Sequence, residues 1–301
     1  MKYRITHTTQ YHYSQAAELC QNEARLQPRD FWRQQCELTC FEISPAPVDF
    51  HERLDYFGNH VAYFAIQQAH RQLVVTAVSE LTLFPEQRSF DASNPLSWEQ
   101  ARSLLQEMPP GKSQRRDQEI ELLDAKQYVL DSPMGIASDE ISRYGQPSFL
   151  PNRPLVDIVR DLMQRIYNDF TYDPSFTTIA TPLSDVLIHR RGVCQDFAHL
   201  AIACLRAYGI AARYVSGYIE TRPAPGKPRT VGADASHAWF SVYSPGMGWL
   251  DFDPTNNTVP ADQHITLAWG RDYSDVTPLK GIAYGGGQHT LSVSVDVLRL
   301  D

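Results

Sequence analysis

The stretch around Cys194 constrains the fold more than any other part of the sequence. Gly192 precedes this cysteine, and a segment with the apolar spacing of an α-helix follows it. The positions that carry this spacing are Phe197, Leu200, Ala201, Cys204, Leu205 and Tyr208. Gly209 then supplies the glycine that is common just past a helix end. The pattern predicts a helix with the Cys194 thiol in or just before its first turn.

A cysteine at this place in a helix has an electrostatic setting of its own. The free N–H groups and the dipole of a helix N-terminus favour an anion, which lowers the pKa of a thiol. Asp196 acts in the opposite direction, because a carboxylate nearby disfavours a second negative charge. A reactive Cys194 therefore needs a histidine whose positive charge outweighs Asp196. Cys204, in the middle of the helix, is expected to be a small buried apolar residue.

Two strand-like segments downstream can supply this histidine and a carboxylate. Residues 236–243 alternate in polarity and place His237 and Trp239 on one face. Residues 249–253 alternate likewise, so that Asp251 and Asp253 share a face. A carboxylate that faces His237 from a neighbouring strand would fix its tautomer and stabilise its cationic form. Alternation alone does not choose between the two aspartates.

Three motifs in this order resemble one known family. They are the Gly-Val-Cys-Gln-Asp-Phe-Ala run, the His-Ala-Trp strand and the Gly-Trp…Asp-Pro-Thr strand. Residues 155–255 therefore resemble the core of the transglutaminase-like superfamily, a papain-like α+β fold. The first 85 residues, together with 270–275 and the glycine-rich run 285–289, resemble the bacterial branch of this superfamily. The resemblance covers most of the chain.

The resemblance implies a role for several residues. Cys194 corresponds to the nucleophile, His237 to the base, and Asp253, in Asp-Pro-Thr, to the carboxylate that orients the base. Tyr172 corresponds to a tyrosine near the active site, and is a candidate for oxyanion or substrate contact. Further candidates for such contacts are Gln195 and Trp239, which belong to the same motifs.

The same residues serve two enzymatic outcomes. A thiolate that attacks an amide forms a thioester, and water or a second amine then resolves it. Water would make the protein a peptidase or amidase, and an amine would make it a transglutaminase; the sequence leaves both open. The alternative from another class is a catalytically silent transglutaminase-like domain that binds peptides or acts as a scaffold. Acyl transfer from coenzyme A uses the same triad, but proteins of that kind carry the cysteine near the N-terminus.

Composition and pattern divide the chain into three parts. Residues 1–85 are rich in strand patterns and predict an all-β domain, with a hairpin between 61–67 and 73–84. Residues 86–150 predict a helical connector. Residues 151–301 predict the catalytic core, including a last strand over 290–300. Helical spacing covers residues 98–108, 117–130 and 155–170.

Charge and cysteine usage exclude several kinds of partner. The net charge of −8 argues against nucleic acid and anionic membranes. No apolar run is long enough to span a membrane, and the first residues lack a signal peptide's apolar core. Five cysteines are an odd, sparse set, which favours reduced thiols in a cytoplasm. The expected partner is a peptide or protein amide substrate, and the oligomeric state stays open.

No cofactor or metal is expected. Cys36 and Cys40 on one strand would lie about 13 Å apart at roughly 3.3 Å per residue, too far for shared ligation, so both are expected in the core. No loop has the acidic spacing of a calcium site. The glycines at 285–287 lack the context of a phosphate loop and are expected to turn the chain into its last strand. The proline-rich residues 221–235 can either rim the cleft or form a solvated connection.

Overall fold

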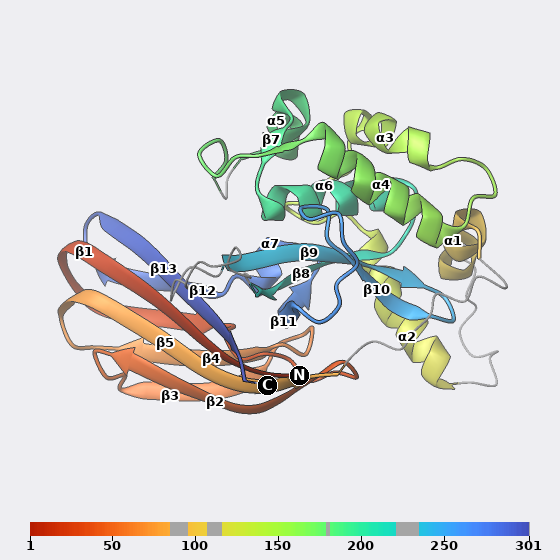
Figure 1. Ribbon diagram of the computed structural model, residues 1–301. Coiled ribbons are helices and arrows are strands. Elements are labelled where there is room, and N and C mark those ends of the chain that lie inside the picture. Colours follow the sequence, from red (N-terminus) through yellow and green to blue (C-terminus); the bar gives the residue numbers. More distant parts are fainter. Residues whose placement is uncertain (85–95, 107–115, 179–180, 221–234, 301) are drawn as a thin grey trace, which may run out of the picture.

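The computed structural model describes residues 1–84, 96–106, 116–178, 181–220 and 235–300. In these residues the chain forms two main β-sheets, with helices on the outer side of the smaller one (Figure 1). The larger sheet has seven strands in the order β2-β5-β1-β4-β3, with β12 and β13 also paired to β1. Its strands are β1 (Lys2–Ala24), β2 (Gln34–Ser44), β3 (Asp49–Leu54), β4 (His60–Ile66), β5 (His70–Leu83), β12 (Leu279–Gly285) and β13 (His289–Arg299).

Strand β1 is the longest strand of the larger sheet. Its 23 residues are long enough for two segments of β1 to pair with different strands. β5 pairs with β1 mainly over residues 2–12, and β4 pairs with it over residues 20–24. The predicted hairpin between β4 and β5 is therefore wrong, because each strand meets a different part of β1 instead of its sequence neighbour.

The last strand also lies elsewhere than expected. β13 pairs with β1 in continuous antiparallel register, from Tyr3 opposite Arg299 to Tyr13 opposite His289. It belongs to the larger sheet and not to the catalytic core, where the sequence division at 151–301 had placed it. The glycine turn is confirmed, because residues 285–287 all have positive φ angles, which only glycine adopts without strain. The other boundaries, near residues 85 and 150, stay predictions.

The smaller sheet has four strands and is covered by helices on one face. Its order is β10-β9-β8-β11, all antiparallel. The strands are β8 (Ala212–Ile219), β9 (Ala235–Ser244), β10 (Gly248–Phe252) and β11 (His264–Gly270). One face of this sheet packs on α6 (Cys194–Ala207), most of whose side chains are buried, and α4 (Leu155–Asp169) covers α6 from outside (Figure 1).

Five short helices remain in the described residues, of which α3 and α5 contact α6. They are α1 (Trp98–Gln106), α2 (Arg116–Lys126), α3 (Asp139–Gly145), α5 (Leu183–His189) and α7 (Tyr273–Val276), with 3-10 turns at Gln127–Val129 and Gln146–Ser148. Besides the helix at Cys194, the helices predicted at 98–108, 117–130 and 155–170 correspond to α1, α2 and α4. The sequence missed α3, α5 and α7, because helices of seven residues or fewer show too little periodicity. Among the described helices, none combines the length and apolar character that crossing a membrane requires.

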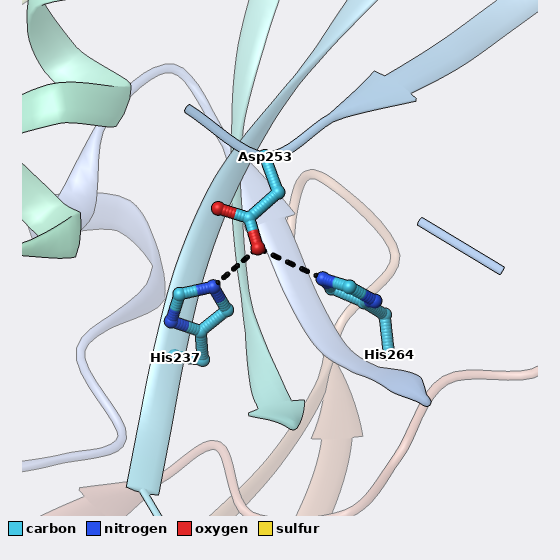
Figure 2. A group of neighbouring side chains, drawn as sticks. All are labelled: His237, Asp253 and His264. Carbon is cyan, nitrogen blue, oxygen red and sulfur yellow. Dashed lines mark hydrogen bonds and ion pairs between the residues drawn. The ribbon is translucent and has the colours of Figure 1, made fainter. Parts of the chain in front are cut away.

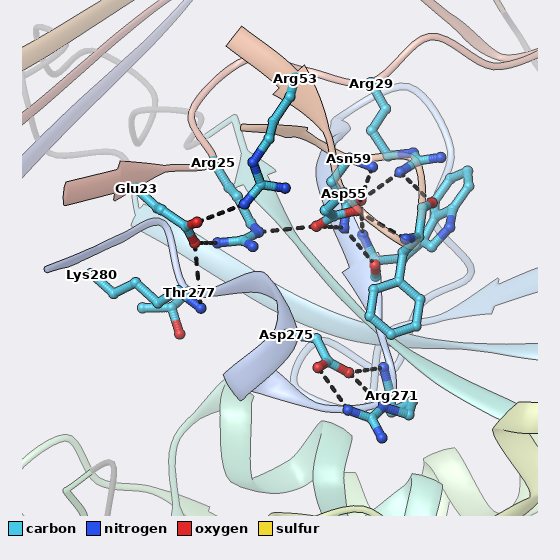
Figure 3. Close-up of polar contacts among 12 residues, drawn as sticks. Glu23, Arg25, Arg29, Arg53, Asp55, Asn59, Arg271, Asp275, Thr277 and Lys280 are labelled. Atoms are coloured by element: carbon cyan, nitrogen blue, oxygen red, sulfur yellow. Dashed lines mark hydrogen bonds and ion pairs between the residues drawn. The ribbon is translucent and has the colours of Figure 1, made fainter. Parts of the chain in front are cut away.

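The two sheets are joined by amide side chains that complete the edge of β11. Gln34 Oε1 accepts a hydrogen bond from Thr266 N (2.9 Å), and its Nε2 donates to Thr266 O (2.8 Å). Asn59 makes the equivalent pair with Trp269 N and Trp269 O, both at 2.9 Å. Arg29 and Asp55 in turn hydrogen-bond to the Asn59 amide (Figure 3). These bonds satisfy backbone groups that an edge strand would otherwise leave open.

The cysteines of the larger sheet correct one expectation. Cys36 is only half-buried and Cys40 is exposed, because both lie on β2, which is an edge strand of the sheet. Cys204 is fully buried, as the sequence predicts. Of the proline-rich segment 221–235, all residues but the last lie outside the described part of the chain.

Candidate active site

Cys194 is the first residue of α6, as the sequence predicts. The chain reaches it through β7 (Arg191–Gly192), which pairs in parallel with β6 (Thr171–Tyr172). The Asp196 carboxylate accepts a hydrogen bond from Val193 N (2.8 Å) and so closes the first turn of the helix. A Cβ atom at Gly192 would lie 2.9 Å from Asp196 Oδ2, so this turn requires glycine. The thiol is half-buried at the positive end of the helix dipole.

Asp196 lies buried in the first turn of α6, close to the thiol. Its side chain is buried, and burial raises the pKa of its carboxyl, although the bond from Val193 N acts in the opposite direction. The carboxylate is thus engaged in capping the helix that carries Cys194.

His237 lies near the start of β9 and is buried between a thiol and a carboxylate. Its Nε2 lies 2.8 Å from Asp253 Oδ2, and a second hydrogen bond joins its ring to the Cys194 side chain. Burial by itself lowers the pKa of His237. The hydrogen bonds to Asp253 and Cys194 outweigh it and raise this pKa from 6.5 to about 10. The ring is therefore held in its cationic form beside the Cys194 side chain.

The structure brings Asp253, and not Asp251, to His237. Asp253 follows the end of β10 and is fully buried. Its Oδ1 accepts hydrogen bonds from Thr255 N (2.9 Å) and Asn256 N (3.2 Å). Burial would raise the pKa of this carboxyl, but the bonds from the surrounding donors lower it well below its usual range. Asp251 instead bonds to Ser241, its direct partner on β9.

His264 is a member of this network that the sequence analysis missed. It is the first residue of β11, and its Nε2 lies 3.0 Å from Asp253 Oδ2, the oxygen that also binds His237 (Figure 2). The side chain is buried, and its Nδ1 has no hydrogen-bond partner. One signal was available, because a histidine opens the apolar run Ile-Thr-Leu-Ala-Trp of β11.

The same three residues form a group of potential metal ligands. The donor atoms of His237, Asp253 and His264 lie within 4.8 Å of one another. Each of these atoms is already engaged in a hydrogen bond with another member of the group. Asn256 Nδ2 donates a further bond to the shared oxygen (2.8 Å). This chemistry is that of an imidazole–carboxylate network, with the carboxylate at its centre.

The three additional site candidates are placed differently. Tyr172 and Gln195 line the same cavity as Cys194. Burial, together with the negative charge of Cys194, raises the pKa of Tyr172. Trp239 does not reach this cavity. It is fully buried, and its ring packs edge-on against His264, with the centroids 5.2 Å apart.

A cavity of about 440 Å³ gives access to Cys194 and His237. One side of it comes from the smaller sheet and the start of α6, and the other side comes from β1 and β13 of the larger sheet. The two sheets therefore form the site together, and neither encloses it alone.

Comparisons with known proteins agree with this arrangement. Residues 3–82 match the bacterial transglutaminase-like N-terminal region, and residues 148–254 match the transglutaminase-like superfamily. An uncharacterized protein of Mycobacterium tuberculosis is 43% identical over the whole of this chain and 93% of its own length. The chain belongs to the transglutaminase-like superfamily, in the branch that carries the bacterial N-terminal region.

Two further matches concern parts of the chain and the fold. The protein-glutamine γ-glutamyltransferase of Pseudomonas aeruginosa is 34% identical over 142 residues, which are 43% of this chain and 20% of that protein. The crystal structure of a candidate cysteine protease from Cytophaga hutchinsonii covers 100% of this chain and 91% of its own, with a TM-score of 0.73 and 21% identity. This likeness confirms the papain-like α+β fold with its β-rich N-terminal region.

Proposed function

We propose that the protein is a cysteine-dependent amide hydrolase or acyltransferase. Cys194 is the nucleophile, His237 is the acid and base, and Asp253 orients His237. The observation that carries this proposal is the continuous path of hydrogen bonds from Cys194 through His237 to Asp253. Such a path is the arrangement that activates a thiol for attack on a carbonyl.

The first half-reaction transfers the acyl group to sulfur. The Cys194 thiolate attacks the carbonyl carbon of an amide, and the negative charge moves to the carbonyl oxygen. Backbone N–H groups in the first turn of α6 have no partner within the helix and can donate to this oxygen. His237 gives its proton to the leaving nitrogen, the C–N bond breaks, and a thioester with Cys194 remains.

The second half-reaction releases the acyl group. Water or an amine attacks the thioester, His237 takes the proton of the attacking group, and Cys194 leaves as the thiolate. Both outcomes use the same three residues. The similarity to a protein-glutamine γ-glutamyltransferase supports an amide of glutamine as the first substrate to test.

We propose a reducing compartment, the cytoplasm, as the site of action. All five cysteines are free in the structure, which is typical of proteins that are kept reduced. Cell fractionation with an antibody to the protein would test this assignment.

The test of the proposed function is a substrate screen with a matched inactive variant. Glutamine-containing peptides are incubated with the wild type and with Cys194→Ala, with and without an added primary amine. Release of the free acid supports hydrolysis, and incorporation of the amine supports acyl transfer. Absence of both, with a Cys194 thiol of ordinary reactivity, would contradict the proposal and favour a peptide-binding or scaffold domain.

A further inference from the structure

The wall of the cavity opposite Cys194 is a regular surface of the larger sheet. Three pairs of directly opposed residues on β1 and β13 line it: Tyr11 and Leu291, Thr9 and Val293, and His7 and Val295. Residues that are directly opposed in an antiparallel pair share one face, so these six side chains form two adjacent rows.

The exposure of the side chains decreases along the β13 row of this wall. Leu291 and Val293 are 53% and 51% exposed, whereas Val295 is 1% exposed. The row of β13 thus runs from an open apolar surface into the buried core between the sheets. Exposed apolar side chains that continue into a cavity beside a nucleophile are a common feature of ligand-binding sites.

The wall also carries no charge. His7 is buried and hydrogen-bonded to Tyr218 Oη (2.9 Å) and to Thr9 Oγ1 (2.9 Å). Burial lowers the pKa of His7 to about 4, so the ring is neutral near pH 7. Among the described residues that line the cavity, none is Asp, Glu, Lys or Arg. A charged side chain of a substrate would find no opposite charge on this wall.

We propose that Leu291 and Val293 bind an uncharged, apolar side chain that adjoins the reactive amide of a peptide substrate. The larger sheet then determines specificity, while the smaller sheet and α6 carry the chemistry. This inference rests on the proposed function for the position of the amide at Cys194. An acidic or basic residue at the same substrate position would lose its hydration against the apolar wall without compensation.

The experiment measures binding without chemistry. Fluorescein-labelled peptides with a central glutamine, flanked by leucine, aspartate or lysine, are titrated with Cys194→Ala by fluorescence polarisation. We expect the leucine peptide to bind about tenfold tighter than the other two, because the wall removes one apolar side chain from water. Equal binding of the three peptides, or no binding of any, would overturn the inference.

Variants of the wall give the matched comparison. Leu291→Asp, made in the Cys194→Ala background, should weaken binding of the leucine peptide about tenfold and abolish the preference. Leu291→Ala removes the contact without adding charge. It tests the same contact if Leu291→Asp fails to fold. The control is Ile282→Asp, at a residue of β12 that is 81% exposed and does not line the cavity. An equal loss in Ile282→Asp would contradict the assignment.

The outcome separates this inference from the proposed function. Selective binding by Cys194→Ala without turnover in the wild type would contradict only the proposed chemistry. Turnover at equal rates for leucine, aspartate and lysine peptides would contradict only the role of the wall.

Discussion

His264 Nε2 lies 3.0 Å from Asp253 Oδ2, the same oxygen that lies 2.8 Å from His237 Nε2. Two imidazoles thus share one carboxylate oxygen in a buried site. His264 Nδ1 has no hydrogen-bond partner, so the ring holds Asp253 through Nε2. His264 therefore helps to fix the position of the carboxylate that orients His237.

Replacement of His264 should weaken the positioning of Asp253 without removing a contact to the substrate. A hydrogen bond to a charged group contributes about 1.5–3 kcal/mol. We expect His264→Ala to lower kcat by roughly one to two orders of magnitude and to leave KM nearly unchanged. His264→Gln, which retains an N–H donor, should recover part of the loss. A normal kcat in His264→Ala would show that His237 and Asn256 hold Asp253 sufficiently.

Replacement of Asp253 should change both rate and pH dependence. Loss of the orienting carboxylate in a triad lowers turnover by roughly four orders of magnitude. In Asp253→Asn the pKa of His237 should also fall from about 10, because its largest charge-stabilising contact is lost. The alkaline limb of the activity profile should therefore move to lower pH. Asp251→Asn, which removes a carboxylate bonded to Ser241, is the control and should change turnover only modestly. An inactive Asp251→Asn beside an active Asp253→Asn would reverse the assignment.

The raised pKa of His237 also predicts how stability depends on pH. The group binds its proton more tightly in the folded state, with a pKa of about 10, than in the unfolded state, where the ordinary value is 6.5. Its contribution to the free energy of unfolding is complete below pH 6.5 and decreases as the pH rises through about 10. Urea unfolding of the wild type and His237→Ala across this range would show it. A difference between the two that stays constant with pH would contradict the raised pKa.

The amide side chains on the edge of β11 should matter for stability. Asn59→Ala removes the two bonds to Trp269 and leaves its partly buried backbone N–H and C=O groups without these partners. We expect a loss of roughly 2–4 kcal/mol in the free energy of unfolding, from about 1–3 kcal/mol per buried unpaired group. Urea unfolding measures it, with exposed Gln35, next to Gln34 on β2, replaced by alanine as the control. Equal stability of both variants would show that water replaces these bonds.

Local patterns predicted much of the fold and most of the site. The helix that starts at Cys194 and the strand of His237 followed from patterns within one segment each, and the choice of Asp253 followed from the family resemblance of the Asp-Pro-Thr motif. The missed features depend on contacts between distant segments. β13 pairs with β1, although the two strands lie near opposite ends of the sequence. His264 hydrogen-bonds to Asp253 from a separate strand. Alternation could not separate Asp253 from Asp251, because the two differ in their hydrogen-bond partners. Asp253 bonds to His237, whereas Asp251 bonds to Ser241.

The pH dependence of Cys194 alkylation tests the central claim most directly, because it needs no substrate. Iodoacetamide labelling is followed by mass spectrometry for each cysteine between pH 4 and 11, in the wild type and in His237→Ala. We predict that Cys194 alone reacts rapidly at pH 6, because the cationic His237 ring is hydrogen-bonded to it, and that His237→Ala abolishes this reaction. Burial raises the pKa of Cys204 to about 12, so this thiol should stay unlabelled in the folded protein. Labelling of Cys194 at pH 6 that is as slow as that of exposed Cys40, or that is unchanged in His237→Ala, would contradict the account.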